Sequence, residues 1–449
     1  MSNSLAELQS NADDVVNDAI RAAIYGSDPI VIVDSPPGAG KTFLVECACA
    51  VALDQPQMRV AVITPNVAQA CDIAERLTSF ENINLTVMHA KHRTLPPALI
   101  GKVRDLTGWD PSVTAAPGIL VANVHVLAQH IEELATDEFD LLILDEAYQL
   151  DGANFLSISP LAPRILMVGD PGQLAPVQQI ETANLEAAEH KMHRPAPEYV
   201  LDRFPNTPTF SLPVTRRLTA DTTQYVQPAF YPDLPFRSVV NDRDRKLEFT
   251  AAGIASPIDR ALDAVASGAS LVAITLQGEA PPHEEVDLEL AELGAQTVRR
   301  IIQRQAVWSE ERTIAEEDIG CIDPHIVSGG AWAQQLRGLG HDDVEVDTVE
   351  RWQGRQKPIV LVRHPLSTVG RPSGFELEKG RWCVSLSRHL LGCIIISRAS
   401  VTQEIEDYLH RSDNAAAGAE DSVWAGFEAH RKIRSKLQEN DRVFSMYGA

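Results

Sequence analysis

The sequence of 449 residues contains little cysteine, no long apolar run and few basic residues for its size. Its six cysteines form no C-x-x-C pair, which argues against zinc and against a disulfide framework and suits a reducing compartment. No apolar run approaches the ~18 residues that a membrane span needs, and the first residues lack the basic-then-apolar order of a signal peptide. We therefore expect a soluble, intracellular (cytoplasmic) protein with no zinc and no membrane partner.

Acidic residues outnumber basic ones by 62 to 39, for a formal net charge of −23. A surface this acidic argues against broad adhesion to nucleic acid but leaves room for a local basic groove. Residues 347–398 are a candidate, since nine basic and four acidic residues give them a net charge of +5. A second, smaller basic stretch lies within residues 81–118, where contact with nucleic acid and an ordinary solvated face are both open; it contains Lys91, Arg93, Lys102 and Arg104.

A glycine-rich stretch, residues 35–42, follows one apolar run and precedes another. This order predicts a strand, a tight loop and a helix, whose backbone N–H groups and helix N-terminus together favour polyphosphate. Lys41 can reach the β- and γ-phosphates, and Thr42 can offer its hydroxyl to Mg²⁺. We expect ATP and Mg²⁺ as cofactors, with the nucleotide held by Pro37, Gly38, Ala39, Gly40, Lys41 and Thr42.

Residues 59–64 are typical of a buried strand, and polar residues follow it. In open α/β sheets the carboxyl ends of the strands line the working edge. Thr64, Pro65 and Asn66 therefore lie where the phosphates of a nucleic-acid strand can be held. The same residues can cap the helix expected from Val67, and the sequence leaves both interpretations open.

Two carboxylates, Asp145 and Glu146, follow the apolar run 141–144. After a phosphate loop, such a pair indicates that Asp145 holds Mg²⁺, directly or through water, and that Glu146 orients the attacking water. Gln173 follows another apolar strand within Gly-Asp-Pro-Gly-Gln. Its amide can hydrogen-bond a γ-phosphate or the attacking water, which would make it a sensor of nucleotide state.

The motifs SPPGAGKT, DEAYQ and GDPGQLAP together resemble those of superfamily 1 helicases. The D-E-A-x-Q form resembles the branch that contains the nonsense-mediated-decay helicase, of superfamily 1B type. Residues 212–218, 318–325, 346–356 and 381–388 are similar to four further motifs of that branch: L-x-x-Q-Y-R-M, I-G-V-I-x-P-Y, T-V-D-x-F-Q-G-x-E and R-x-N-V-A-L-T-R-A. The resemblance spans roughly residues 15–398.

The resemblance implies further site residues. Arg217 and Arg388 fall on arginines that meet the γ-phosphate, so the expected catalytic set is Lys41, Glu146, Gln173, Arg217 and Arg388. It also implies a nucleic-acid contact at Thr348 and nucleotide contacts at Gln353, Gly354 and Gln356. Trp352 can stack on a base or, like the Phe it aligns with, pack in the core.

The sequence departs from the family pattern at several positions. Ser35 stands in place of the first glycine of the phosphate loop, and Gln356 replaces a Glu that helps to hold the nucleotide sugar. Cys383 replaces an Asn, and His389 replaces an Ala. No Gln stands near Val16, where the family often carries a residue that reads adenine. These departures concern nucleotide choice and turnover more than the fold.

The resemblance implies an α/β fold of two RecA-like domains, with mainly parallel sheets flanked by helices and ATP in the cleft between them. We expect an N-terminal ATP-binding domain over residues 1–206, with its small basic insertion at about 81–118. A C-terminal helicase domain over residues 207–400 and a helical extension over 401–449 follow.

The sequence therefore predicts an ATP hydrolase, a helicase or translocase that steps along single-stranded DNA or RNA, 5′ to 3′ by resemblance. The alternative is an NTP-driven remodelling or regulatory ATPase that acts mainly on a protein partner, which the acidic balance keeps open. The choice between DNA and RNA depends on 2′-hydroxyl contacts at positions that no motif specifies.

Overall fold

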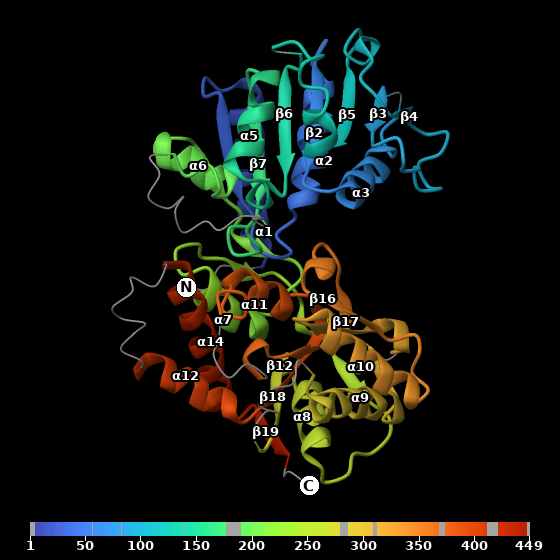
Figure 1. The fold of residues 1–449 in the computed structure, drawn as a ribbon, viewed down its shortest axis with the longest axis vertical. Coiled ribbons are helices and arrows are strands. Elements are labelled where there is room, and N and C mark those ends of the chain that lie inside the picture. The colour runs from blue at the N-terminus through green and yellow to red at the C-terminus, as the bar shows by residue number, and fades with distance from the viewer. Residues whose placement is uncertain are drawn as a thin grey trace. The chain divides into compact units, whose positions relative to one another are not determined.

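The computed structural model describes residues 5–55, 57–81, 83–136, 138–176, 190–278, 286–308, 312–367, 373–410 and 421–446. The chain forms two compact units: Met1–Pro171 with Ala175–Val214, and Gly172–Leu174 with Thr215–Ala449. Each unit is a mixed α/β fold on a parallel sheet with helices against it (Figure 1), which confirms the expected fold class. Within the described residues, no helix combines the length and the apolar character needed to cross a membrane.

The first unit is built on an eight-stranded parallel sheet with the spatial order β4-β3-β5-β2-β6-β7-β1-β8. The strands are β1 Ile30–Asp34, β2 Arg59–Thr64, β3 Leu85–Met88, β4 Arg104–Leu106, β5 Gly118–Asn123, β6 Leu141–Asp145, β7 Ile165–Gly169 and β8 Thr209–Ser211. Its helices are α1 Leu5–Tyr25, α2 Lys41–Leu53, α3 Val67–Leu77, α4 Val124–Ala128, α5 Gly152–Ile158 and α6 Ala196–Arg203.

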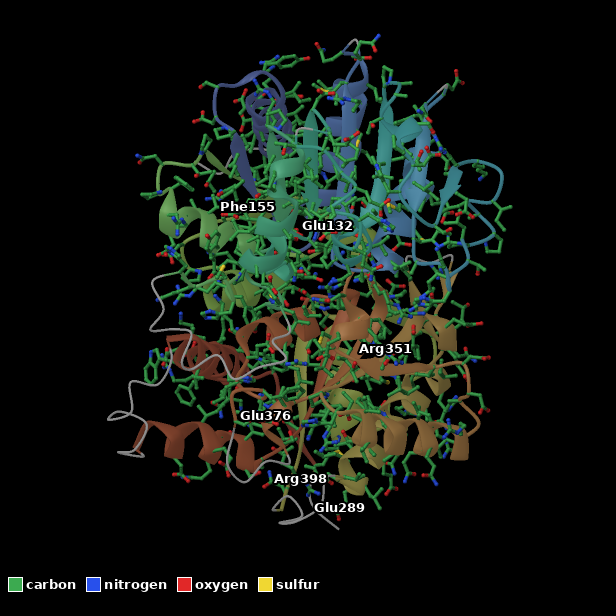
Figure 2. All side chains as sticks on the ribbon, turned by 45° about the horizontal axis from the view of Figure 1, so that its top comes forward. Glu132, Phe155, Glu289, Arg351, Glu376 and Arg398 are labelled. Atoms are coloured by element: carbon green, nitrogen blue, oxygen red, sulfur yellow. The ribbon has the colours of Figure 1, made fainter. Side chains whose placement is uncertain are left out.

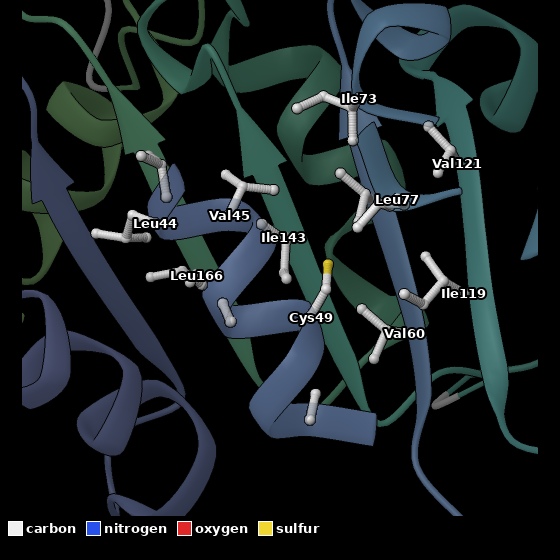
Figure 3. Close-up of a cluster of buried hydrophobic side chains, with 14 of the residues drawn as sticks. Leu44, Val45, Cys49, Val60, Ile73, Leu77, Ile119, Val121, Ile143 and Leu166 are labelled. Atoms are coloured by element: carbon white, nitrogen blue, oxygen red, sulfur yellow. The ribbon is translucent and has the colours of Figure 1, made fainter. Parts of the chain in front are cut away.

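The central strands of this sheet are apolar along their whole length because both faces are covered by helices. Val31 and Val33 of β1 point into the cluster under α1, α2 and α3, whereas Ile32 points into the cluster under α4, α5 and α6. Figure 3 shows the first of these layers, in which Leu44 and Val45 of α2 lie over the sheet. This packing fixes the start of α2, and with it the phosphate loop, at the carboxyl end of β1.

The second unit is built on a six-stranded parallel sheet with the order β16-β15-β17-β18-β12-β19. A two-stranded sheet (β9, β10) and a three-stranded antiparallel sheet (β11, β13, β14) accompany it. The strands are β9 Val214–Thr215, β10 Arg237–Ser238, β11 Leu247–Phe249, β12 Leu271–Leu276, β13 Ala306–Trp308, β14 Arg312–Thr313, β15 Ile319–Asp323, β16 Glu345–Thr348, β17 Lys357–Arg363, β18 His389–Arg398 and β19 Val443–Met446.

The helices of the second unit cover both faces of its sheet in the same way. They are α7 Ala220–Phe230, α8 Pro257–Ala266, α9 Leu288–Gln303, α10 Ile326–Gly338, α11 Lys379–Leu386, α12 Ser400–His410 and α14 Asp421–Glu439. Val272 of β12 packs in the cluster under α8, α9 and α10, whereas Ala273 packs in the cluster under α7, α11 and α14.

A buried ion pair closes the far end of β18. Arg398 is 2% exposed, and its guanidinium donates to the carboxylates of Asp287 (2.7 Å) and Glu289 (2.6 Å), the two residues on either side of the start of α9. Figure 2 shows Arg398 and Glu289 together. Asp287 is itself fully buried, so this pair is part of the framework of the second unit.

The C-terminal segment is built into the second unit. Helix α14 packs on α7 and α11, and β19 pairs in parallel with β12. Arg442 holds this end in place by donating to both carboxylate oxygens of Asp221 (2.6 and 2.8 Å). Of the helical extension expected over residues 401–449, α12 and α14 are present, β19 is a strand that the sequence did not reveal, and residues 411–420 and 447–449 lie outside the described residues.

A glycine on α14 makes this packing testable. A Cβ atom at Gly426 would lie 1.6 Å from the backbone carbonyl oxygen of Leu377, which cannot move without shifting the chain. We expect Gly426→Ala to destabilise the second unit by about 1–3 kcal/mol or more, measured as a lower urea midpoint. Gly330→Ala on α10 is the matched control, since nothing lies within 4 Å of its added Cβ, and it should not lower that midpoint.

Candidate functional site

The phosphate loop lies between β1 and α2. Gly38 (φ 73°) and Gly40 (φ 103°) both adopt the left-handed conformation that glycine reaches without strain, and Gly40 is the residue before the helix. No side chain caps the first turn of α2, so its N–H groups remain available to an anion. The hydroxyl of Ser35, which replaces the family glycine, is buried and has no hydrogen-bond partner in the described chain.

A buried cluster of charges faces this loop from the end of β6. The Nζ atom of Lys41 forms an ion pair with the carboxylate of Glu146, and the two side chains are only 15% and 9% exposed. Although burial lowers the pKa of Lys41, the charges of Glu146 and Asp145 outweigh it and raise the pKa above its ordinary value. Lys41 is therefore firmly protonated, as a phosphate ligand must be.

Asp145 is the last residue of β6 and is 5% exposed. Burial raises its pKa to about 6, against the opposing charge of Lys41. Its Oδ1 atom is buried without a hydrogen-bond partner in the described chain. A buried carboxylate oxygen left in this way fits a ligand to a divalent cation, which prefers oxygen.

Glu146 follows Asp145 with φ 58° and ψ 41°, a left-handed conformation that is uncommon outside glycine. Such a conformation costs of the order of 1 kcal/mol or more and is typical of functional sites. It turns the side chain of Glu146 toward Lys41, so the strained residue is the one that makes the ion pair.

Sequence reasoning missed three residues beside this cluster. The hydroxyl of Tyr148 donates to Oδ1 of Asp34 over 2.7 Å, at the end of β1. Burial raises the pKa of Asp34, with the Tyr148 bond acting in the opposite direction. Asp170, after β7, is 2% exposed and also acts on the charge of Lys41. Asp34 and Asp170 each follow an apolar run, and this pattern was the signal in the sequence that could have identified them.

Arg217 and Arg388 lie in the second unit, each beside a glutamine. Nε of Arg217 donates to Oε1 of Gln356 (2.9 Å), and Nη2 of Arg388 donates to Oε1 of Gln173 (2.9 Å). Arg388 is 1% exposed. Gln173 groups with the second unit, where its carbonyl meets Gly380, although the sequence division had placed it in the first.

His389 follows Arg388 in the chain, is buried, and stands where the resembling helicase motif has Ala. Its Nε2 atom is 2.8 Å from the hydroxyl of Thr222. Burial lowers the pKa of His389 to about 3, with smaller contributions from Arg217 and Arg245. The ring is therefore neutral and adds no charge to the arginines.

The remaining nucleotide residues implied by the resemblance surround a turn before β17. Gly354 has φ 75° and is exposed, while Nε2 of Gln353 is buried without a partner in the described chain. Trp352 is 0% exposed and packs in the core, with its ring against Gly320. Base stacking by Trp352 is therefore ruled out, and core packing is the correct alternative.

The residues expected to hold a nucleic-acid strand in the first unit make local hydrogen bonds. Thr64 is buried and donates to the carbonyl of Asn66 (2.8 Å), and the Asn66 side chain accepts from the Gln69 N–H (3.0 Å) as the cap of α3. Pro65 is half-buried between them. Thr348 ends β16, half-buried, at the carboxyl edge of the second sheet.

The two basic segments differ in how their charges are used. In residues 347–398, six of the nine basic side chains form ion pairs with carboxylates, so the net charge of +5 does not describe an open groove; they are Arg351, Arg355, Lys357, Arg363, Arg381 and Arg398. In residues 81–118, Lys91, His92 and Arg93 are exposed directly after β3.

Three buried histidines predict acid sensitivity of the second unit. Burial lowers the pKa of His389 to about 3 and of His430 to about 4, and it holds that of His364 well below 6.5. The unfolded chain takes up these protons near pH 6.5 and the folded chain does not, so stability is complete above pH 6.5 and is lost below it. At pH 5, His389 and His430 should each cost about 2 kcal/mol of folding stability, and the effect of His364 has the same sign.

This expectation is checked by urea unfolding of the second-unit transition at about pH 7.5 and pH 5. His430→Gln removes one titrating ring. The fall in the urea midpoint from pH 7.5 to pH 5 should therefore be smaller in this variant than in wild type. An equal loss in wild type and in variants of all three histidines would contradict this assignment.

Comparison with known proteins bears mainly on the first unit. A family model described as an AAA domain matches residues 16–195. No curated protein matches the sequence. The matched region contains the phosphate loop and the Lys41–Glu146 pair.

Solved structures with a similar arrangement include three helicases. A complex of the arterivirus nonstructural protein 10 helicase with DNA shares 14% identity and a TM-score of 0.43, over 86% of this chain and 63% of that one. The PRRSV helicase shares 15% identity with a TM-score of 0.40, and the match covers 90% of this chain and 56% of that one. The Escherichia coli DEAH/RHA helicase HrpB shares 13% identity with a TM-score of 0.45, and the match covers 88% of this chain and 43% of that one.

This chain spans less than two thirds of each of those three chains. At these identities and TM-scores, their activities do not extend to it. The match of an AAA-domain model to residues 16–195, together with the charged loop geometry, supports nucleotide binding by the first unit.

Proposed function

We propose that this chain is a superfamily 1 helicase, an ATP hydrolase that steps 5′ to 3′ along single-stranded DNA or RNA. The observation that carries the hydrolase assignment is the buried cluster of Lys41, Asp145 and Glu146 beside the phosphate loop, within the AAA-domain match. The D-E-A-x-Q branch, the direction and the nucleic-acid partner rest on the motifs.

In this proposal, the backbone of residues 37–42 holds the triphosphate of ATP at the start of α2. Thr42 and Asp145 are the residues that would hold Mg²⁺, and the unpartnered Oδ1 of Asp145 fits that role. When bound, Mg²⁺ supplies positive charge against the phosphate oxygens.

Lys41 and Glu146 have to separate for turnover. While they are paired, the charge of each side chain balances that of the other. When Lys41 turns to the phosphates of ATP, Glu146 is released, and it can then orient a water molecule and accept its proton. Nucleotide binding thus produces the base that hydrolysis needs. The guanidinium groups of Arg217 and Arg388 add positive charge for the transition state, a contribution worth about 10³–10⁵-fold in related systems.

The proposed nucleic-acid contacts lie at the carboxyl edges of both sheets. In the second unit, Ile326 and Val327 are 78% and 56% exposed, beside His325, which stacks on Phe375 (centroids 5.1 Å apart). Exposed apolar and aromatic groups of this kind suit unstacked bases. In the first unit, Lys91 and Arg93 follow β3, two strands from Thr64, and offer charge to the backbone.

Glu146→Gln tests the hydrolytic assignment. Because the amide cannot accept a proton, we expect the ATP turnover number to fall by about 10²–10⁴-fold while ATP affinity is kept, measured by steady-state turnover and nucleotide titration. Glu132→Gln, at an exposed carboxylate (Figure 2), is the matched control and should leave both unchanged. Full turnover in Glu146→Gln would refute the role of Glu146.

Turnover with and without polymer tests the nucleic-acid assignment. We expect matched single-stranded DNA or RNA oligonucleotides to raise the ATP turnover number, with the better activator identifying the partner. Unchanged turnover with both polymers, in a protein that still binds Mg²⁺ and ATP, would favour the alternative of a remodelling ATPase that acts on a protein partner.

A further inference from the structure

The second unit also contains a cavity whose lining has been given no functional role. It has a volume of about 400 Å³ and is enclosed by the beginning of α7, the end of α8 and the segment before β11. None of the expected site residues lines it. Its walls differ sharply in chemistry.

One wall carries three cations within four residues: Arg243, Arg245 and Lys246. Lys246 pairs with Glu248. The guanidinium of Arg245 lies over the ring of Trp308, 5.6 Å from its centroid, and within the described chain neither Arg243 nor Arg245 forms a side-chain hydrogen bond or an ion pair. Burial lowers the pKa of Arg245, because its surroundings do not fully compensate its charge.

The lining also contains Thr219, Ser267 and Ser270. The Thr219 hydroxyl donates to that of Ser270, whereas the Ser267 hydroxyl donates to the Asp263 carbonyl and keeps its acceptor capacity. One carboxylate, that of Asp221, also lines the cavity, but it already accepts from both Arg442 and Ser270. Its negative charge is therefore balanced by a partner outside the cavity lining. The cations on the first wall keep their attraction for an anion.

The rest of the lining is apolar and comes from Leu247, Val265 and Leu391, together with Ala266. A bare inorganic anion would leave this surface uncovered. A ligand with a charged phosphate end and a flat, weakly polar body matches both parts, and a volume of this order is typical of small-molecule sites.

We propose that this cavity binds a nucleotide through its phosphate, at a site separate from the phosphate loop. Arg243 and Arg245 hold the phosphate, the Ser267 hydroxyl accepts a hydrogen bond from the sugar or base, and the base lies against Leu247 and Leu391. The nucleotide is either free in solution or one unit of a nucleic-acid strand, since both present the same phosphate and base.

The cavity is connected to the arginines of the second unit. The Ser270 hydroxyl is 2.6 Å from that of Thr222, which is 2.8 Å from Nε2 of His389, the residue after Arg388. The lining residue Ser270 therefore belongs to a continuous buried hydrogen-bonded path that ends beside Arg388. Occupation of this site is in a position to alter turnover.

The experiment uses the full chain with Lys41→Ala, which removes nucleotide binding at the phosphate loop. AMP and a 5′-phosphorylated four-residue deoxythymidine oligonucleotide are titrated separately by calorimetry, with adenosine as the probe that lacks phosphate. We expect one equivalent of AMP or of the oligonucleotide to bind and adenosine to bind at least tenfold more weakly. The better probe identifies a free nucleotide or a strand as the ligand.

Adding Arg245→Ala or the shape-conserving Arg245→Gln should weaken that binding at least tenfold, whereas Arg299→Ala, at an exposed arginine on α9, should not. The thermal midpoint of each variant shows whether it is folded. If only one of Arg245→Ala and Arg245→Gln is folded, the binding measured with that variant decides the result. Absence of binding by both probes, or binding that Arg245→Ala and Arg245→Gln leave intact, overturns the proposal.

Discussion

The buried ion pair between Lys41 and Glu146 is the interaction on which the site of the first unit depends. Taking a charge out of water costs several kcal/mol, so neither group could be buried without the other. A ligand that takes Lys41 away from this pair must itself supply positive charge to balance Glu146 and the adjacent Asp145. An anion that brought a divalent cation would meet this condition, since Asp145 and Glu146 would then face positive charge in place of Lys41. The loop geometry, the strained Glu146 and the unpartnered Oδ1 of Asp145 are all consistent with that exchange.

Arginines of the second unit are held by two kinds of side chain. Arg398 is held by the carboxylates of Asp287 and Glu289, which cancel its charge and make it part of the framework. Arg217 and Arg388 instead donate to the amide oxygens of Gln356 and Gln173. Gln356 stands where the resembling helicase motif carries a Glu, so the side chain that Arg217 contacts here is a neutral amide.

The features that the sequence predicted are those that short, contiguous patterns of residues specify. The phosphate loop, the strand before Asp145 and the parallel character of both sheets follow from local apolar runs and their flanking residues. The bond between Tyr148 and Asp34 joins residues 114 positions apart, and no motif records it. Charge counting also failed in residues 347–398, because it cannot tell a solvated arginine from Arg363, which is buried and paired with Asp323. The grouping of Gln173 with the second unit depends on packing against Gly380, which no pattern near Gln173 reveals.

The pairing of β12 with β19 has a consequence for how the chain is made. Thr275 of β12 and Ser445 of β19 are hydrogen-bonded across 170 positions of sequence. On a ribosome, β12 emerges long before its neighbour, and one edge of that strand stays open throughout the interval. Long-range pairing of this kind slows folding and exposes a strand edge to other chains. The open edge of β12 is thus a part of the second unit that needs protection during translation until β19 has been made.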